Sequence, residues 1–287
     1  MSGGLYDGLT LNPVYGAGYT NTYGTAFVQK WPTPVRDYDA VSVTVNKLFS
    51  KRWLAQASYT WSSLRGNYGG LLRTDSDQLD PNLSSDYDLV GLQGNKTGPL
   101  GLNREHQLKL AGSYNASLSS DVSFVPSMNF QAYSGIPVNA LAGNEYYGFS
   151  EVSLLPRGTP GNLGWTYQVD LGAKVIWAIS GPYTLQFSLD IFNVLNMASV
   201  QWVDNDYTFD SASPIQNAQC SNKDSATAKN PIQALQADCS DLPFARTVDG
   251  RRVTVNPNYG QPQASSNARV SAYQLPISAR FGVQLSF

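Results

Sequence analysis

The sequence predicts an all-β protein, an antiparallel transmembrane β-barrel, of which this chain forms a partial barrel of about 7–10 strands. Three observations lead to this fold class. Apolar residues recur at alternate positions in about seven segments of about ten residues each. Short connections alternate with long ones along the chain. No stretch approaches the ~18 uninterrupted apolar residues of a membrane-spanning helix, and no helical periodicity persists.

The composition fits a β-rich chain with polar loops. Only 14% of the 287 residues are charged, whereas 12% are aromatic, with 17 Tyr, 6 Trp and 25 Gly. The formal net charge is -2 and there is no long basic run. Because a basic footprint is the mark of nucleic-acid binding, we expect no nucleic-acid partner.

The first two predicted strands form a hairpin. The first strand places on one face Val41, Val43 and Val45, and on the other Ser42, Thr44 and Asn46. A short turn from Lys47 to Arg52 follows. The second strand then alternates on one face Trp53, Ala55, Ala57, Tyr59 and Trp61, with polar residues opposite. This period of two indicates strands with one apolar and one polar face.

Five further strands follow the same pattern. They are predicted at residues 105–114, 122–132, 167–177, 184–191 and 277–287. Pro126 interrupts the fourth strand, and since proline cannot donate to a ladder, we expect a bulge or local irregularity there. Aromatic residues gather at the strand ends and are expected to form two interfacial girdles: Trp53, Trp61, Tyr114, Tyr133, Tyr167, Trp177 and Tyr183.

The connections predict an orientation and a domain division. Long loops span about 65–104, 134–165 and 196–274, and they alternate with short turns. Outer-membrane barrels sort their connections in this way, with short periplasmic turns and long extracellular loops, so the C-terminus is expected at the periplasmic rim. Residues 37–287 form the predicted barrel segment. Residues 1–36 are an expected extracellular loop or irregular lead-in, with one further candidate strand at 26–31.

Closure of the barrel is a separate question. About seven strands is an odd number below the usual minimum, and the first and last strands would run parallel if they were forced together. We therefore expect an open sheet, or one that other strands complete. No secretion leader begins at Met1, so we expect either that a leader was removed or that the chain is a fragment of a longer protein.

The alternation assigns candidate residues to the two faces. Lipid contact is expected for Val43, Leu110, Phe130, Val169, Phe187 and Val283. The interior is expected to hold the polar-face charges Glu105, Lys109, Asp170, Lys174, Asp190 and Arg280. These charges could define a permeation path or contact a plug, but more often such residues keep a water-filled lumen solvated.

No catalytic constellation is present in the sequence. His106 is the only histidine, and its parity places it on the apolar face near a strand end. Both Ser/His/Asp and histidine-cluster mechanisms would need that residue, so we expect no enzyme and no cofactor.

Two loops carry weaker signals. Cys220 and Cys239 lie in one polar segment without a CxxC pair or a neighbouring histidine, so a disulfide is expected in an oxidising compartment. The other signal is a group of aspartates that could hold calcium or simply form a solvated acidic loop, without EF-hand spacing: Asp75, Asp77, Asp80, Asp86 and Asp88.

Short motifs add a family resemblance. Residues 277–287 alternate and end on phenylalanine, and they resemble the C-terminal assembly signal of outer-membrane proteins through Phe281, Val283, Leu285 and Phe287. That resemblance implies recognition by the barrel-assembly machinery. From 36 to 287, the chain resembles the C-terminal part of TonB-dependent receptors, especially the Oar-like group, in the segments RDYD at 36–39, ASYTWS at 57–62, GNYGG at 66–70, YSGIP at 133–137 and DIFNVLN at 190–196.

The resemblance implies a function as well as a fold. Members of the family are barrels of about 22 strands with an N-terminal plug and a TonB box. It implies that this chain is the C-terminal barrel portion of a receptor or transporter for a bulky substrate. Its partners would be bacterial outer-membrane lipid and, through N-terminal parts, the TonB system. The alternatives are a structural or adhesin-like barrel whose loops bind a partner and, from another class, a soluble β-sandwich that binds carbohydrate.

Overall fold

The computed structural model describes residues 18–20, 28–30, 34–73, 85–86, 90–215, 242, 245–263 and 271–287. Within these residues the regular structure is β-strand, apart from single 3₁₀ turns such as η3 (Val90–Gln93). No helix among them is long and apolar enough to cross a membrane. The all-β expectation is therefore confirmed.

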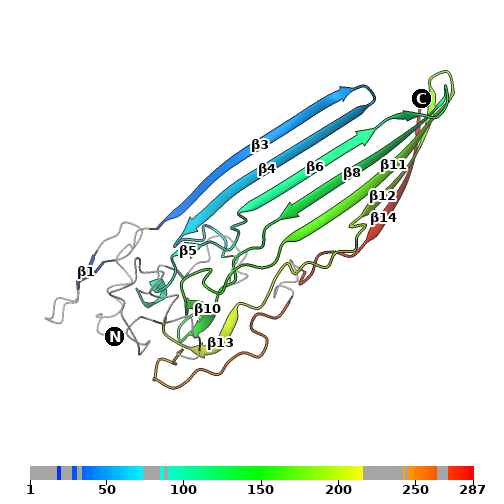
Figure 1. Cartoon of the computed structure of the whole chain (residues 1–287). Helices are drawn as coiled ribbons and strands as arrows, with labels where there is room; N and C mark the ends of the chain where they lie inside the picture. The colour runs from blue at the N-terminus through cyan, green and yellow to red at the C-terminus, as the bar shows by residue number, and fades with distance from the viewer. Residues whose placement is uncertain are drawn as a thin grey trace.

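Long antiparallel strands form one sheet. They are β3 (Arg36–Ser50), β4 (Trp53–Gly66), β6 (His106–Tyr114), β8 (Val122–Tyr133), β11 (Thr166–Ser180), β12 (Tyr183–Phe192) and β14 (Ser278–Ser286). Their spatial order is β14-β12-β11-β8-β6-β4-β3, and the short strands β5 (Gly98–Pro99) and β7 (Ala116–Ser117) pair with β4 and β8. The expected open sheet is confirmed, because β3 and β14 lie at opposite edges (Figure 1).

The first hairpin is longer than the sequence indicated. β3 continues to Ser50, and the turn consists of Lys51 and Arg52, whose φ angles are 51° and 71°. Two positive φ values match the twist of a tight hairpin. The Lys47 side chain lies on the apolar face, and its ammonium donates to the Ser50 carbonyl at 3.1 Å and lies 4.1 Å from the Trp53 ring centre. Lys47 thus belongs to the strand rather than to the turn.

Pro126 causes the expected irregularity. The ladder between β6 and β8 ends at Ser113, and β7 resumes the pairing with β8 at Ala116. In the gap, the Asn115 N–H donates instead to the Arg52 carbonyl at 2.7 Å. On its other side β8 pairs with β11 through Pro126 without a register shift. Proline lacks an N–H and so cannot donate to a neighbouring strand. The interruption lies only in the ladder on the β6 and β7 side of β8.

The register keeps the two faces of the sheet separate across all the long strands. Val169 pairs with Phe130, and Phe130 pairs with Leu110. On the opposite face Gln168 pairs with Gln131, and Gln131 pairs with Lys109. The apolar face is open to the surroundings at both edges and in between, since Val43 is 58%, Phe187 38% and Val283 57% exposed. No second sheet covers it within the described part of the chain, which disfavours the β-sandwich alternative.

The hydrophobic core lies outside the long sheet. At one end of the sheet the long connections contain a smaller sheet of β9 (Leu141–Asn144), β10 (Gly148–Ser153) and β13 (Asp206–Ser211), in the order β10-β9-β13. The C-terminus and the short turns lie at the other end (Figure 1). The strands β1 (Gly18–Thr20) and β2 (Val28–Lys30) pair with each other, so the candidate strand at 26–31 contains β2 but does not extend the long sheet.

A charge on the apolar face tests its contact with lipid. We expect Phe187→Arg in the full-length protein to lower the free energy of unfolding by about 2–4 kcal/mol if the side chain lies near the bilayer midplane. The measurement is denaturant unfolding in lipid vesicles. Gln186→Arg is the matched control on the polar face of the same strand, and we expect a much smaller change. Equal losses in the two variants would contradict the assignment of faces.

Candidate functional site

The three long connections fold together into one unit, called here the loop unit. Its buried apolar side chains come from all three connections: Leu92, Ala140, Ala142, Val152, Leu154, Leu155, Tyr207, Ala212, Ile215 and Ala245. Burial removes this apolar surface from water and thereby stabilises the unit. The open sheet forms no comparable core. The sequence showed three separate loops and did not reveal that they share a core.

A buried ionic network ties the first connection to the second. Asp86 is fully buried, and its Oδ1 lies 3.0 Å from Lys96 Nζ and 3.5 Å from Arg73 Nε. Arg73 also donates to Glu151 at 2.6 Å, in β10. Burial alone would raise the pKa of Asp86, but the adjacent Lys96 and Arg73 cations lower it to about 2. Asp86 is therefore ionised and held by two cations.

This geometry bears on the calcium candidate. Asp75, Asp77, Asp80 and Asp88 lie outside the described residues. Among the residues that are described, no group of three or more His, Cys, Asp or Glu side chains could hold a metal ion. A calcium site at these aspartates stays a prediction from the sequence.

A second carboxylate of the loop unit behaves in the opposite way. Asp206, at the start of β13, accepts a hydrogen bond from Ser150 Oγ at 2.9 Å. Burial raises its pKa to about 6, and the nearby Asp204 and Glu151 carboxylates add to the increase. Near neutral pH, Asp206 therefore carries a charge at a cost to the stability of the loop unit.

The segment DIFNVLN holds the third connection to the sheet. The Asn193 N–H donates to Asp170 Oδ1 at 2.9 Å, and Asn193 Nδ2 donates to the carbonyls of Met197 and Leu275 at 2.9 and 2.8 Å. Asn196 Oδ1 accepts from the Ile277 N–H at 3.0 Å. Both ends of the connection are thus fastened beside β11, which gives this motif a structural role.

The structure places most of the predicted interior charges on the polar face. Asp190 and Arg280 pair at 2.8 Å across β12 and β14, while Lys109 Nζ lies 5.9 Å from the Tyr133 ring centre. Lys174 lies on the same face, opposite Ser188. Glu105 precedes β6, and its carbonyl accepts from the Ser62 N–H at 2.9 Å. Only Asp190 and Arg280 are joined directly, and a lumen lined by these residues stays a prediction.

The assembly-signal residues lie along the free edge of the sheet. Phe281, Val283 and Leu285 are 68%, 57% and 56% exposed in β14, and Phe287 follows the strand at 90%. Their side chains share the apolar face with Leu189, Phe187 and Leu185 of β12. Exposure on this face is compatible with the expected role in assembly, which stays a prediction.

Aromatic rings form a row where the apolar face meets the loop unit. His106 stacks between Tyr59 and Trp165, with ring centres 6.2 and 5.8 Å away, and Trp165 stacks on Tyr167 at 6.1 Å. The Tyr59 hydroxyl lies 2.9 Å from His106 Nδ1. His106 thus lies among aromatic rings at the end of the apolar face, and its interfacial location stays a prediction. Tyr133 was wrongly grouped with the girdle aromatics, because it pairs with Gln107 and Thr166 on the polar face.

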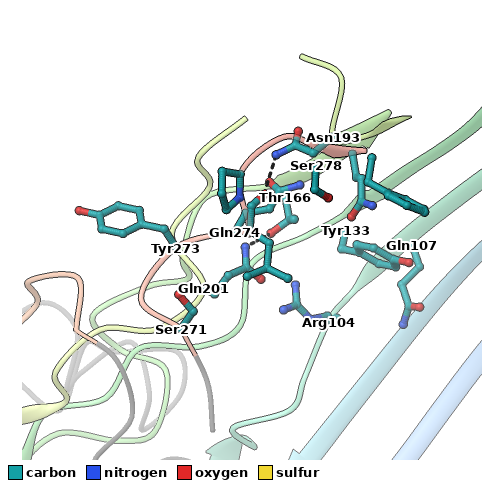
Figure 2. A pocket seen from close by; sticks show the side chains of 14 residues that line it. Arg104, Gln107, Tyr133, Thr166, Asn193, Gln201, Ser271, Tyr273, Gln274 and Ser278 are labelled. Atoms are coloured by element: carbon teal, nitrogen blue, oxygen red, sulfur yellow. Dashed lines mark hydrogen bonds between the residues drawn. The ribbon is translucent and has the colours of Figure 1, made fainter. Parts of the chain in front are cut away.

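A pocket of about 700 Å³ lies on the polar face beneath the loop unit. Its lining includes Arg104, Gln107, Tyr133, Thr166, Gln168, Phe192, Asn193, Gln201, Tyr273 and Gln274 (Figure 2). Strand parity could have indicated Gln107 and Gln168. No pattern in the sequence predicts that Gln201 and Gln274 lie close together. Arg104 lies before β6, so the alternation of that strand does not assign it to a face.

Comparison with known proteins gives one match. The chain is 37% identical over 272 residues to the "TonB-dependent transporter Oar" of Myxococcus xanthus. The alignment covers 93% of this chain and 24% of that protein, in its C-terminal part, so the chain spans about a quarter of its relative's length. No family model matches the sequence, and no solved structure matches it.

Asp206 makes the stability of the loop unit pH-dependent. Its folded pKa of about 6 lies above the ordinary value of 3.8, so its contribution is full below pH 3.8 and is lost as the pH rises through 6. We expect the change in the free energy of unfolding caused by Asp206→Asn to be about 2–3 kcal/mol more stabilising at pH 8 than at pH 4. Hydrogen exchange in residues 139–155 and 205–212, corrected for the intrinsic rate, measures this. Asp249→Asn is the control: the exposed Asp249 carboxylate pairs with Arg251, and side-chain hydrogen bonds lower its pKa, so this change should not stabilise the unit at pH 8. Equal effects of Asp206→Asn at both pH values would contradict the prediction.

The predicted disulfide lies outside the described residues. We expect Cys220 and Cys239 to be joined in the oxidised protein, because a cell-surface loop meets an oxidising environment. Alkylation before and after reduction, followed by mass spectrometry, should label neither cysteine before reduction and both after it. Labelling of the unreduced protein would refute the pairing.

Proposed function

Because the chain belongs to the TonB-dependent receptor family, as a relative of the C-terminal part of Oar, we propose that it forms the C-terminal barrel wall of an outer-membrane transporter for a bulky substrate. The observation that carries the proposal is the identity of 37% along 93% of the chain. It agrees with the resemblance that the short motifs indicated. The matched part is 24% of the relative, so the activity of the whole protein is inferred and not observed.

The dimensions of the apolar band support a membrane location. On β11 the outward aromatics Tyr167 and Trp177 stand near the two ends of the strand, ten positions apart. Ten residues of strand span about 33 Å, which at a barrel tilt of about 40° corresponds to a height of about 25 Å. This is the height of the apolar band of outer-membrane barrels.

The arrangement of connections supports an orientation. All long connections meet in the loop unit at one end of the sheet, and the short turns lie at the other end with the C-terminus (Figure 1). We propose that the loop unit is extracellular and that the C-terminus is periplasmic. In this orientation the barrel-assembly machinery would recognise β14, and lipid would cover the apolar face. TonB would act through upstream parts of the protein.

A transporter and an adhesin-like barrel differ in their dependence on energy. The proposal makes no use of an enzymatic step, and the relative is a transporter by name. A structural barrel whose loops bind a partner has no specific observation in its favour. The two functions are separable because only transport requires the TonB system.

The proposal is tested through cargo. Proteins and peptides of the periplasm and the medium are compared among wild-type cells, cells lacking this protein and cells lacking TonB. We expect one set of molecules to be misplaced in the same direction in both deletion strains. A molecule misplaced without this protein but correctly placed without TonB would favour the adhesin-like alternative. Fractionation with outer-membrane lipopolysaccharide provides the control for location.

A further inference from the structure

We propose that the pocket beneath the loop unit binds a peptide-like ligand whose carboxylate pairs with Arg104. The pocket lies where the polar face of β6, β8 and β11 meets the third connection (Figure 2). The inference rests on the proposed function only in identifying this ligand as cargo. Its binding chemistry follows from the residues of the pocket alone.

Arg104 supplies a charge that no carboxylate of the described residues neutralises. Its Nη1 donates to the Ser134 carbonyl at 2.8 Å, and its guanidinium lies 5.9 Å from the Tyr133 ring centre. Within the described part of the chain, no carboxylate pairs with it. In Figure 2 the guanidinium reaches into the space between Gln201 and Tyr133. The remaining N–H groups of its planar fork can therefore serve a ligand, and they match the two oxygens of a carboxylate.

Amide side chains, among them Gln274, form part of the lining. Gln274 Nε2 donates to the Tyr167 carbonyl at 2.9 Å, whereas its Oε1 is buried without a hydrogen-bond partner among the described residues. That oxygen is closed off from the pocket, so a ligand cannot reach it, and Gln274 serves only to fix this wall. Gln107 and Gln201 also line the pocket, and their amide groups can donate to and accept from the peptide groups of a ligand.

The surroundings select against more highly charged ligands. Gln168 lines the pocket and donates to the Asp170 carboxylate at 2.8 Å, so a negative charge stands just behind the wall. Arg104 supplies one positive charge, which suits a monoanion better than a phosphate dianion. Phe192 and Leu275 add apolar surface that can accept a small aliphatic side chain.

The same chemistry could come from two sources. The carboxylate could belong to a free peptide that enters from the loop unit, or to a segment of the same polypeptide upstream of this chain. The open lining at Ser271 and Tyr273, which belong to the loop unit's third connection, favours entry of a free peptide. The upstream segment is therefore an outcome that the experiment must detect.

The test measures binding of two matched probes to the full-length protein in detergent. The probes are N-acetylated tetra-alanine with a free C-terminal carboxylate and the same peptide as its C-terminal amide. We expect the acid to bind wild-type protein at least tenfold more tightly than the amide, by calorimetry or saturation-transfer NMR. Arg104→Gln should remove this preference, and Arg104→Lys should keep part of it. The control is Arg251→Gln, whose side chain is 78% exposed and paired with Asp249.

Each outcome decides the proposal. Equal binding of acid and amide, or an unchanged preference in Arg104→Gln, overturns it. If neither probe binds, and a photo-crosslinker at position 107 captures an upstream segment of the same polypeptide, the pocket is filled from within and the proposal fails. Heat-modifiable migration on gels verifies that each variant is folded. Binding in detergent needs no TonB, so a preference for the acid would survive even if cargo placement proved independent of TonB.

Discussion

The continuous antiparallel ladder from β3 to β14 is the constraint on which the other features depend. Each strand pairs with its neighbours in a register that keeps Leu110, Phe130 and Val169 on one face and Lys109, Gln131 and Gln168 on the other. A shift of one residue in any pair would exchange the faces. In hydrocarbon, backbone N–H and C=O groups must also be paired within the sheet, so the ladder has to satisfy hydrogen bonding and face separation together.

A sheet of this kind has no hydrophobic core, and the molecule gains one elsewhere. The apolar face is exposed in the described part of the chain, so burial of apolar side chains takes place in the loop unit, around Leu154 and Ile215. The unit is fastened to the sheet by specific polar contacts, above all the Asp170–Asn193 hydrogen bond at 2.9 Å. These contacts hold the third connection against the sheet, where its residues and those of the polar face line the pocket.

The polar face and the loop unit together bring polar and charged side chains to one side of the sheet. On the polar face Asp190 pairs with Arg280, and Asp170 accepts hydrogen bonds. Arg104, like Lys109 and Lys174, has no acidic partner among the described residues, and it differs from those two lysines because it lines the pocket. We propose that Arg104 is a recognition element beneath the loop unit and that the charges further along the face keep it hydrated.

The sequence by itself determined the strands, their two faces and the open sheet, because side-chain parity has a period of two and is written directly in the order of residues. It also determined the family, through motifs such as DIFNVLN. The shared core of the three connections, the burial of Asp86 between Lys96 and Arg73, and the presence of Arg104 and Gln274 in the lining of one pocket were decided only by the tertiary structure. These contacts join residues far apart in the chain, and loops have no periodicity from which such contacts could be predicted. Tyr133 shows that residue type can mislead within a strand. Its aromatic ring suggested the girdle, whereas its position in the alternation puts it on the polar face, where it lines the pocket.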